Sequence, residues 1–182
     1  MTYYGPKELA ASFLTVRNNT VKIAEEIPED QYGFRATPDS RSVAETLVHI
    51  AVAPRLQEQI QFVEHRSTLV GFDFFAMLGS LIAEEKTARS KAEIIAMLRT
   101  EGDKYAKQLA GVSEELLAET VHYPEGMQPP TKSRFEMLMA PKEHEMHHRG
   151  QLMVAQRLLG LTPHLTRQIN ERIAAMKAAA SK

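Results

Sequence analysis

The 182-residue chain contains no cysteine. This absence excludes disulfides, and it excludes a protein thiolate as a nucleophile or as a metal ligand. A chain without disulfides fits a reducing compartment. Any sulfur nucleophile that the protein uses must therefore come from a small molecule.

An excess of charge of one sign is also lacking, since 22 basic residues stand against 23 acidic ones. This balance gives no electrostatic case for binding nucleic acid or an anionic membrane. No window reaches the roughly 18 apolar residues that a membrane-spanning helix needs, and the first residues, MTYYGPKELAASFL, lack the basic and apolar regions of a signal peptide. We therefore expect a soluble, cytoplasmic protein.

Strand signals are scarce, because the chain has no sustained alternation of apolar and polar residues and no Asn-Gly hairpin. Helical periodicity is present instead. In the first segment, apolar residues recur at alternating steps of four and three, which is typical of the buried seam of a helix bundle. The members of this seam are Leu9, Phe13, Val16, Thr20, Ile23 and Ile27.

Capping signals predict where two further helices begin. Ser42 with Glu45, and Ser90 with Glu93, match the capping box, in which the serine and the glutamate each bond a backbone N–H of the other. The helix after Ser42 should bend at Pro54.

The helix after Ser90 should end at Gly111, although Gly102 weakens its middle. The remaining segments are a long helix over 133–159, short helical pieces near 70–85 and 113–120, a turn-rich connection over 121–133, and a segment after Pro163 that should fray. The pattern predicts an all-α protein, a four-helix bundle with short extra helices in a single domain over residues 1–182.

Histidines are concentrated in EHEMHHRGQL, residues 143–152. Residues four apart lie one above the other on a helix, so His144 and His148 share a face with the apolar residues Met137, Leu152, Ala155 and Leu159. His49 shares a face of the second helix with Val52, Ala53, Leu56, Ile60 and Val63. All three histidines should therefore point toward the core.

Burying an imidazole without a hydrogen-bond partner costs about 1–3 kcal/mol. A divalent metal would organise three of them, because neutral imidazole nitrogens bind zinc, nickel, copper or iron. Three protein ligands leave coordination positions open, which is typical of a reactive site. The pattern predicts His49, His144 and His148 as metal ligands. The alternatives are a hydrogen-bonded core histidine at position 49 and a surface pair at positions 144 and 148.

Other polar residues near these positions have less specific readings. Glu45 and Gln151 are candidates to orient an imidazole or a bound water, although Glu45 is equally explained as a capping residue. His147 should lie beside the ligands or in solvent. The remaining histidines have no partner at ligand spacing and should be surface or capping residues: His65, His122 and His164.

The letters HEMHH also match H-E-x-x-H, the helix motif of zinc proteases, in which Glu145 would be the general base. Gly150 comes too early for the extended form of that motif, and no later histidine fits. Glu171 is the one downstream carboxylate that could complete such a site. A zinc hydrolase of this type is thus a weaker alternative.

Two blocks together resemble the DinB family, a group of DinB/YfiT-like metalloenzymes. HEMHHRGQL is similar to its H-x-x-x-H-R-G-Q signature, and YGFRATPDSRSVAETLVHI is similar to its upstream block. The resemblance implies an up-down-down-up four-helix bundle, frequent homodimers, and nickel or zinc bound by His49, His144 and His148. The chain departs from the family pattern at Pro141, which should bend the helix or mark the start of a straight segment, and at Ala36, where proline is common.

The resemblance implies either thiol-dependent transfer, with a low-molecular-weight thiol as co-substrate, or hydrolysis of a small molecule. We expect thiol transfer slightly ahead of hydrolysis. The alternative from another class is a non-catalytic metal-binding module for stress or protein interaction. An apolar pocket of roughly 300 Å³ or more at the site would favour an enzyme.

Overall fold

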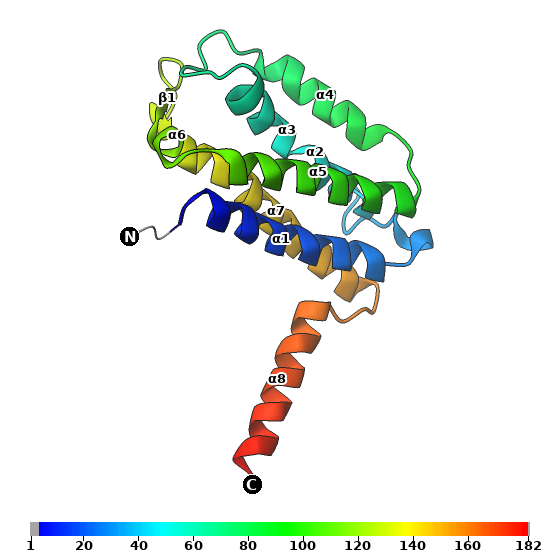
Figure 1. The fold of residues 1–182 in the computed structure, drawn as a ribbon. Helices are drawn as coiled ribbons and strands as arrows, with labels where there is room; N and C mark the ends of the chain where they lie inside the picture. The colour runs from blue at the N-terminus through cyan, green and yellow to red at the C-terminus, as the bar shows by residue number, and fades with distance from the viewer. Residues whose placement is uncertain (1–3, 182) are drawn as a thin grey trace.

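The computed structural model describes residues 4–181, and its core is a bundle of four helical segments (Figure 1). These segments are α1 (Pro6–Glu26), α2 (Val43–Val52) with its continuation through α3 (Pro54–Gln57) and the π-helical η2 (Glu58–Val63), α5 (Lys91–Gly111) and α7 (Arg134–Leu158). Helices α1 and α2 each pack against both α5 and α7. Helices α1 and α7 run in one direction and α2 and α5 in the other, so the predicted up-down-down-up four-helix bundle is confirmed.

Helix α4 (Phe74–Lys86) is the predicted short extra helix near 70–85. Because α2 and α5 run parallel, the chain must return along the bundle between them. Helix α4 makes this return and packs against α2 (Figure 1). The short pieces η1 (Glu29–Gln31) and α6 (Glu114–Ala118) connect the longer helices.

Capping boxes set the first residues of the long helices. The Glu45 N–H donates to Ser42 Oγ at 3.2 Å, and the Ser42 N–H donates to Glu45 Oε2 at 2.7 Å. Ser90 and Glu93 form the same pair. Each box satisfies two of the backbone donors that a helix start leaves without partners, so both predicted starts are confirmed.

The predicted seam of α1 is buried along its whole length, from Leu9 to Ile27. Helix α2 keeps its predicted face as far as Ile60, which is 2 % exposed, but Val63 is 64 % exposed. The wider π-helical turns of η2 rotate the chain after Glu58, so the prediction that Val63 lies on the inward face was wrong.

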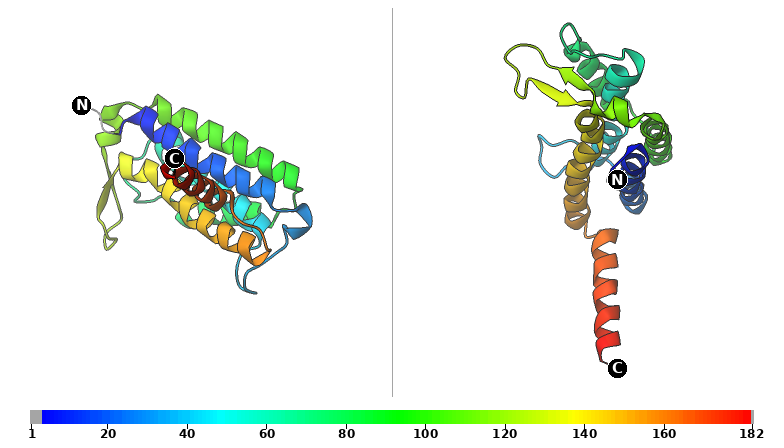
Figure 2. Two further views of the ribbon diagram at one scale, coloured as in Figure 1. Left: turned by 90° about the horizontal axis from the view of Figure 1, so that it is seen from below. Right: turned by 60° about the vertical axis from the view of Figure 1, so that its left-hand side comes forward.

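The turn-rich connection over 121–133 contains a small hairpin. Strand β1 (Thr120–His122) pairs antiparallel with β2 (Thr131–Ser133), with Thr120 opposite Ser133. Strands of three residues carry too little alternation to be recognised in the sequence. Val121 is fully buried in this hairpin, which closes one end of the bundle (Figure 2).

The segment after Pro163 is the continuous helix α8 (His164–Ala180), which projects away from the bundle (Figures 1 and 2). The expectation that it frays was wrong. Its first residue, His164, is buried beside Asn19 at 3.1 Å and is not a surface residue. Farther along, α8 exposes Ile169, Ile173 and Met176. The homodimer implied by the resemblance stays a prediction.

Among residues 4–181, no helix combines the length and the apolar character required to cross a membrane.

An ion pair lies at the centre of the bundle. The Arg17 guanidinium on α1 binds the Glu145 carboxylate on α7 with an Nη2–Oε2 distance of 2.9 Å, and both side chains are 2 % exposed. Arg17 also donates to the Leu98 carbonyl on α5 at 2.7 Å and to the Ile50 carbonyl on α2 at 3.1 Å. One buried side chain thus connects all four segments of the bundle.

Gly102 on α5 provides the space for this arginine. A Cβ atom at position 102 would lie 2.8 Å from Arg17 Cγ, which is closer than real Cβ contacts allow. The glycine that weakens α5 in the sequence is therefore explained by its close approach to Arg17.

We expect Gly102→Ala to destabilise the fold, because crowding the ion-paired Arg17 costs about 1–3 kcal/mol while the gain in helix propensity is about 1 kcal/mol. Gly79→Ala on α4 is the matched control, since nothing lies within 4 Å of its Cβ position, and it should be neutral or stabilising. Thermal and urea unfolding measure both effects. A Gly102→Ala variant as stable as Gly79→Ala would contradict this account.

Candidate metal centre

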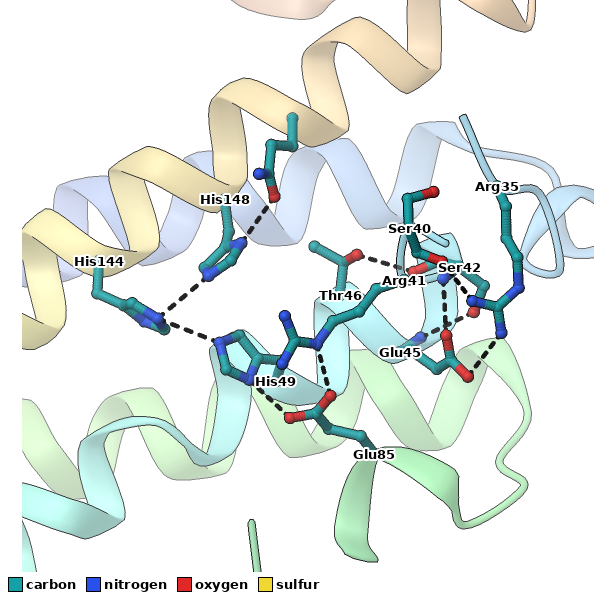
Figure 3. A network of polar contacts seen from close by, with 11 residues as sticks. Arg35, Ser40, Arg41, Ser42, Glu45, Thr46, His49, Glu85, His144 and His148 are labelled. Carbon is teal, nitrogen blue, oxygen red and sulfur yellow. Dashed lines mark hydrogen bonds and ion pairs between the residues drawn. The ribbon is translucent and has the colours of Figure 1, made fainter. Parts of the chain in front are cut away.

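Three imidazole rings meet where α2, α4 and α7 come together (Figure 3). His49 comes from α2, and His144 and His148 come from successive turns of α7. His144 Nε2 lies 3.1 Å from His49 Nε2 and 3.1 Å from His148 Nε2. The potential ligand atoms of the three residues all lie within 4.8 Å of one another. The structure therefore brings together the three residues singled out from the sequence.

The spacing of these nitrogens fits a single cation. Imidazole nitrogens bind zinc at about 2.0–2.1 Å, so two of them on one ion lie about 3.0–3.4 Å apart. The observed separation is 3.1 Å for both pairs that involve His144. The donor chemistry also fits, since neutral imidazole is a preferred ligand of zinc and nickel.

Glu85 on α4 orients His49. Its Oε1 lies 2.7 Å from His49 Nδ1, and its side chain is 8 % exposed. Because an ionised carboxylate only accepts hydrogen bonds, His49 donates from Nδ1 and keeps the lone pair of Nε2 toward the other two rings. Sequence reasoning missed Glu85, because the contact depends on α4 folding back against α2.

Gln151 orients His148. Gln151 Oε1 lies 2.8 Å from His148 Nδ1, so the His148 N–H donates to the amide oxygen and Nε2 again faces the cluster. The Gln151 amide nitrogen lies 3.3 Å from His147 Nε2. His147 itself is exposed. The hydrogen bond to an imidazole considered for Gln151 is thus present, and His147 lies outside the cluster, in solvent.

Glu45 does not contact an imidazole. Its carboxylate accepts from Arg35 at 2.7 Å and from the Ser42 N–H. The hydrogen bond from Arg35, followed by that from Ser42, lowers the pKa of the Glu45 carboxyl below its usual value. The capping interpretation of Glu45 is correct, and its role in orienting an imidazole was wrong.

Glu145 points away from the histidines. It follows His144 in the chain, so it faces about 100° around the helix from it, and its carboxylate is bound to Arg17 in the bundle centre. It is therefore not positioned as the general base of a zinc-protease helix. Glu171, the possible downstream ligand, is exposed on the projecting α8. The zinc-protease alternative was wrong on both residues.

The three imidazoles are held in their neutral form. Burial is the largest cause that lowers the pKa of His49, His144 and His148 below the usual value of 6.5. For His144, burial and the neighbouring His148 and His49 bring the pKa to about 4. At neutral pH, His49 and His148 therefore present Nε2 lone pairs, and His144 presents a third when its proton is on Nδ1, which is the tautomer that binds a cation.

Two cavities border the cluster. The larger, of about 640 Å³, is lined by polar and apolar residues that include Arg41, Glu85 and His148. The smaller, of about 240 Å³, is mainly apolar and adjoins His49 and His144. The apolar cavity is below the 300 Å³ that we took as favouring an enzyme, whereas the mixed one exceeds it.

The model of the DinB family matches residues 1–176. The chain belongs to the DinB family. A relative within reach of sequence comparison is YjoA of Bacillus subtilis (strain 168), which is 24 % identical over 159 residues, covering 85 % of this chain and 91 % of YjoA.

Solved structures give the same fold for this DinB-family protein. YjoA from B. subtilis superposes with a TM-score of 0.62 at 23 % identity, covering 85 % of this chain and 94 % of the other. YfiT from B. subtilis, described as "a probable metal-dependent hydrolase with an unusual four-helix bundle topology", gives 0.68 at 13 % identity, covering 89 % and 91 %. A Streptococcus pneumoniae protein superposes with a TM-score of 0.62 at 20 % identity, covering 86 % of this chain and 93 % of the other.

We expect the metal-free protein to lose stability as the pH falls from about 6.5 toward about 4. The unfolded chain takes up protons on these histidines below pH 6.5, whereas His144 in the fold has a pKa of about 4. Each histidine contributes a slope of at most about 1.4 kcal/mol per pH unit.

Urea unfolding of chelator-treated protein across this range measures the effect. His144→Gln, which removes the group with the lowest pKa, should unfold with a shallower pH dependence than the wild type. Equal slopes for the two proteins would contradict the assigned burial of a neutral His144.

Proposed function

We propose that this DinB-family protein is a metal-dependent enzyme that acts on a small molecule, with His49, His144 and His148 as the ligands of one divalent cation, zinc or nickel. The observation that carries the proposal is that His144 Nε2 lies 3.1 Å both from His49 Nε2 on α2 and from His148 Nε2 on α7. Without a cation, the contacts are satisfied only if His144 carries its proton on Nε2 and donates it to the other two rings.

The chain's own residues prepare this site for a cation. Glu85 and Gln151 hold the Nδ1 hydrogens of His49 and His148, which fixes both rings and increases their basicity as ligands. A divalent cation in this position supplies Lewis acidity, which lowers the pKa of a water or a thiol that it binds. The three histidines leave other coordination positions to small molecules.

Thiol-dependent transfer is the reaction that we favour. Glu85, which contacts His49, and the two candidates from the sequence, Glu45 and Glu145, each bind an arginine, so none of the three is a free general base for water. A thiol, with a pKa of about 8.5, ionises far more easily than water. The chain has no cysteine, so the thiol would be a co-substrate. Hydrolysis is the second candidate, supported by the description of YfiT as a metal-dependent hydrolase.

The non-catalytic alternative is less well supported. The 640 Å³ cavity includes His148 in its lining and has the size of a small-molecule pocket. A module that only stores or senses a metal would not require such a space beside its ligands.

His148→Ala should reduce bound metal from about one ion per chain to near zero, because it removes one of three ligands. His147→Ala is the matched control, since the neighbouring His147 is exposed and lies outside the cluster, and it should keep the metal. Elemental analysis after zinc or nickel loading measures the metal bound per chain in both variants. Full occupancy in His148→Ala would remove that residue from the site.

Zinc- and nickel-loaded protein should catalyse the attack of a low-molecular-weight thiol on monochlorobimane, in which a C–S bond forms, chloride leaves and the thiol proton passes to buffer. Fluorescence follows the product, and His148→Ala should fall to the uncatalysed rate. A parallel assay with p-nitrophenyl acetate and no thiol tests hydrolysis. Activity in the ester assay alone would reverse our order of the two reactions, and no activity in either would favour the non-catalytic module.

A further inference from the structure

Arg41 directly precedes Ser42, the N-cap of α2, and its side chain extends toward the three histidines (Figure 3). Its Nε donates to Glu85 Oε2 at 2.6 Å, on the oxygen opposite the one that binds His49. Among residues 4–181, no hydrogen bond is made by its two terminal nitrogens, Nη1 and Nη2. The side chain is 41 % exposed and lines the 640 Å³ cavity together with His148.

Glu85 thus binds Arg41 through Nε and leaves Nη1 and Nη2, on a side chain that lines the cavity, without a hydrogen-bond partner among the described residues. A guanidinium anchored in this way has already lost much of its rotational freedom, so binding a ligand costs less entropy. Nη1 and Nη2 can bind two oxygens of one carboxylate or phosphate, with strong charge-assisted hydrogen bonds.

The charge of the site favours an anion as well. The three imidazoles are neutral ligands, and the negative charge of Glu85 is offset by Arg41. A bound divalent cation would therefore keep its two positive charges.

We propose that Arg41 binds an oxyanion group of the substrate, a carboxylate or a phosphate, and that the small molecules on which this protein acts are anionic. This inference rests on the proposed function, because it assumes a cation at the three histidines. It adds a binding residue from outside the histidine cluster and a chemical class for the substrate.

Arg35 is the natural control. It lines the same cavity, but its two Nη atoms donate to the Ser40 carbonyl and to Glu45. Arg35→Gln removes the same charge from the same wall, but the terminal nitrogens that it removes already have partners within the protein. Comparing it with Arg41→Gln separates direct contact from a general change in charge.

The experiment uses the full chain loaded with Co²⁺, whose visible absorption reports on ligands that enter its coordination or lie close to it. Acetate, inorganic phosphate and neutral acetamide are titrated separately. We expect the wild type to bind at least one oxyanion at least about tenfold more tightly than acetamide, since hydrogen bonds between charged groups contribute this much. The oxyanion that binds more tightly identifies the class.

Arg41→Gln should weaken oxyanion binding at least about tenfold and leave the affinity for acetamide unchanged. Arg35→Gln should change the oxyanion affinity less than about twofold. Arg41→Lys, which keeps the charge but loses the paired donors, should be intermediate. The lysine variant serves as the test variant if Arg41→Gln does not retain cobalt.

Equal oxyanion affinity in the wild type and the Arg41 variant would overturn this inference alone. An equal loss in Arg35→Gln would also overturn it, because general charge would then account for the effect. Failure of the wild type to bind Co²⁺ would overturn the proposed function and this inference with it.

Discussion

The buried ion pair between Arg17 and Glu145 is the constraint on which the rest of the bundle depends. Two charges in an apolar interior are stable only if almost every donor and acceptor is matched. Arg17 meets this condition by binding the carboxylate and the carbonyls of Ile50 and Leu98. We infer that the pair specifies how the four helical segments approach one another, where apolar contacts alone would permit small shifts.

The residues that the ion pair holds in place are direct neighbours in sequence of two of the clustered histidines. Ile50, whose carbonyl accepts from Arg17, follows His49, and Glu145 follows His144. Arg17 thus fixes the register of α2 against α7 from the inside of the bundle. The histidines, one residue earlier, meet on the outer side of the same contact. A shift by one helical turn would separate their nitrogens by about 5 Å.

The Arg17–Glu145 ion pair and the histidine cluster differ in their electrostatics. At the bundle centre, the opposite charges of Arg17 and Glu145 neutralise each other in a buried contact. At the cluster, neutral imidazoles are fixed by Glu85 and Gln151, and Arg41 keeps two donors unengaged. The first arrangement stabilises a single geometry, and the second leaves an accessible cavity beside it. We infer that rigidity and reactivity are divided between two faces of α7.

The sequence by itself determined the helices of the bundle, because helical periodicity and capping boxes depend only on residues three or four positions apart in the chain. It also determined which histidines could share a face, since residues 144 and 148 are one turn apart. Only the tertiary structure decided the partners of these residues. Glu85 reaches His49 because α4 folds back on α2, and Glu145 turns inward because Arg17 lies opposite it. Such contacts join residues 36 and 128 positions apart, and spacing along the chain carries no information about them.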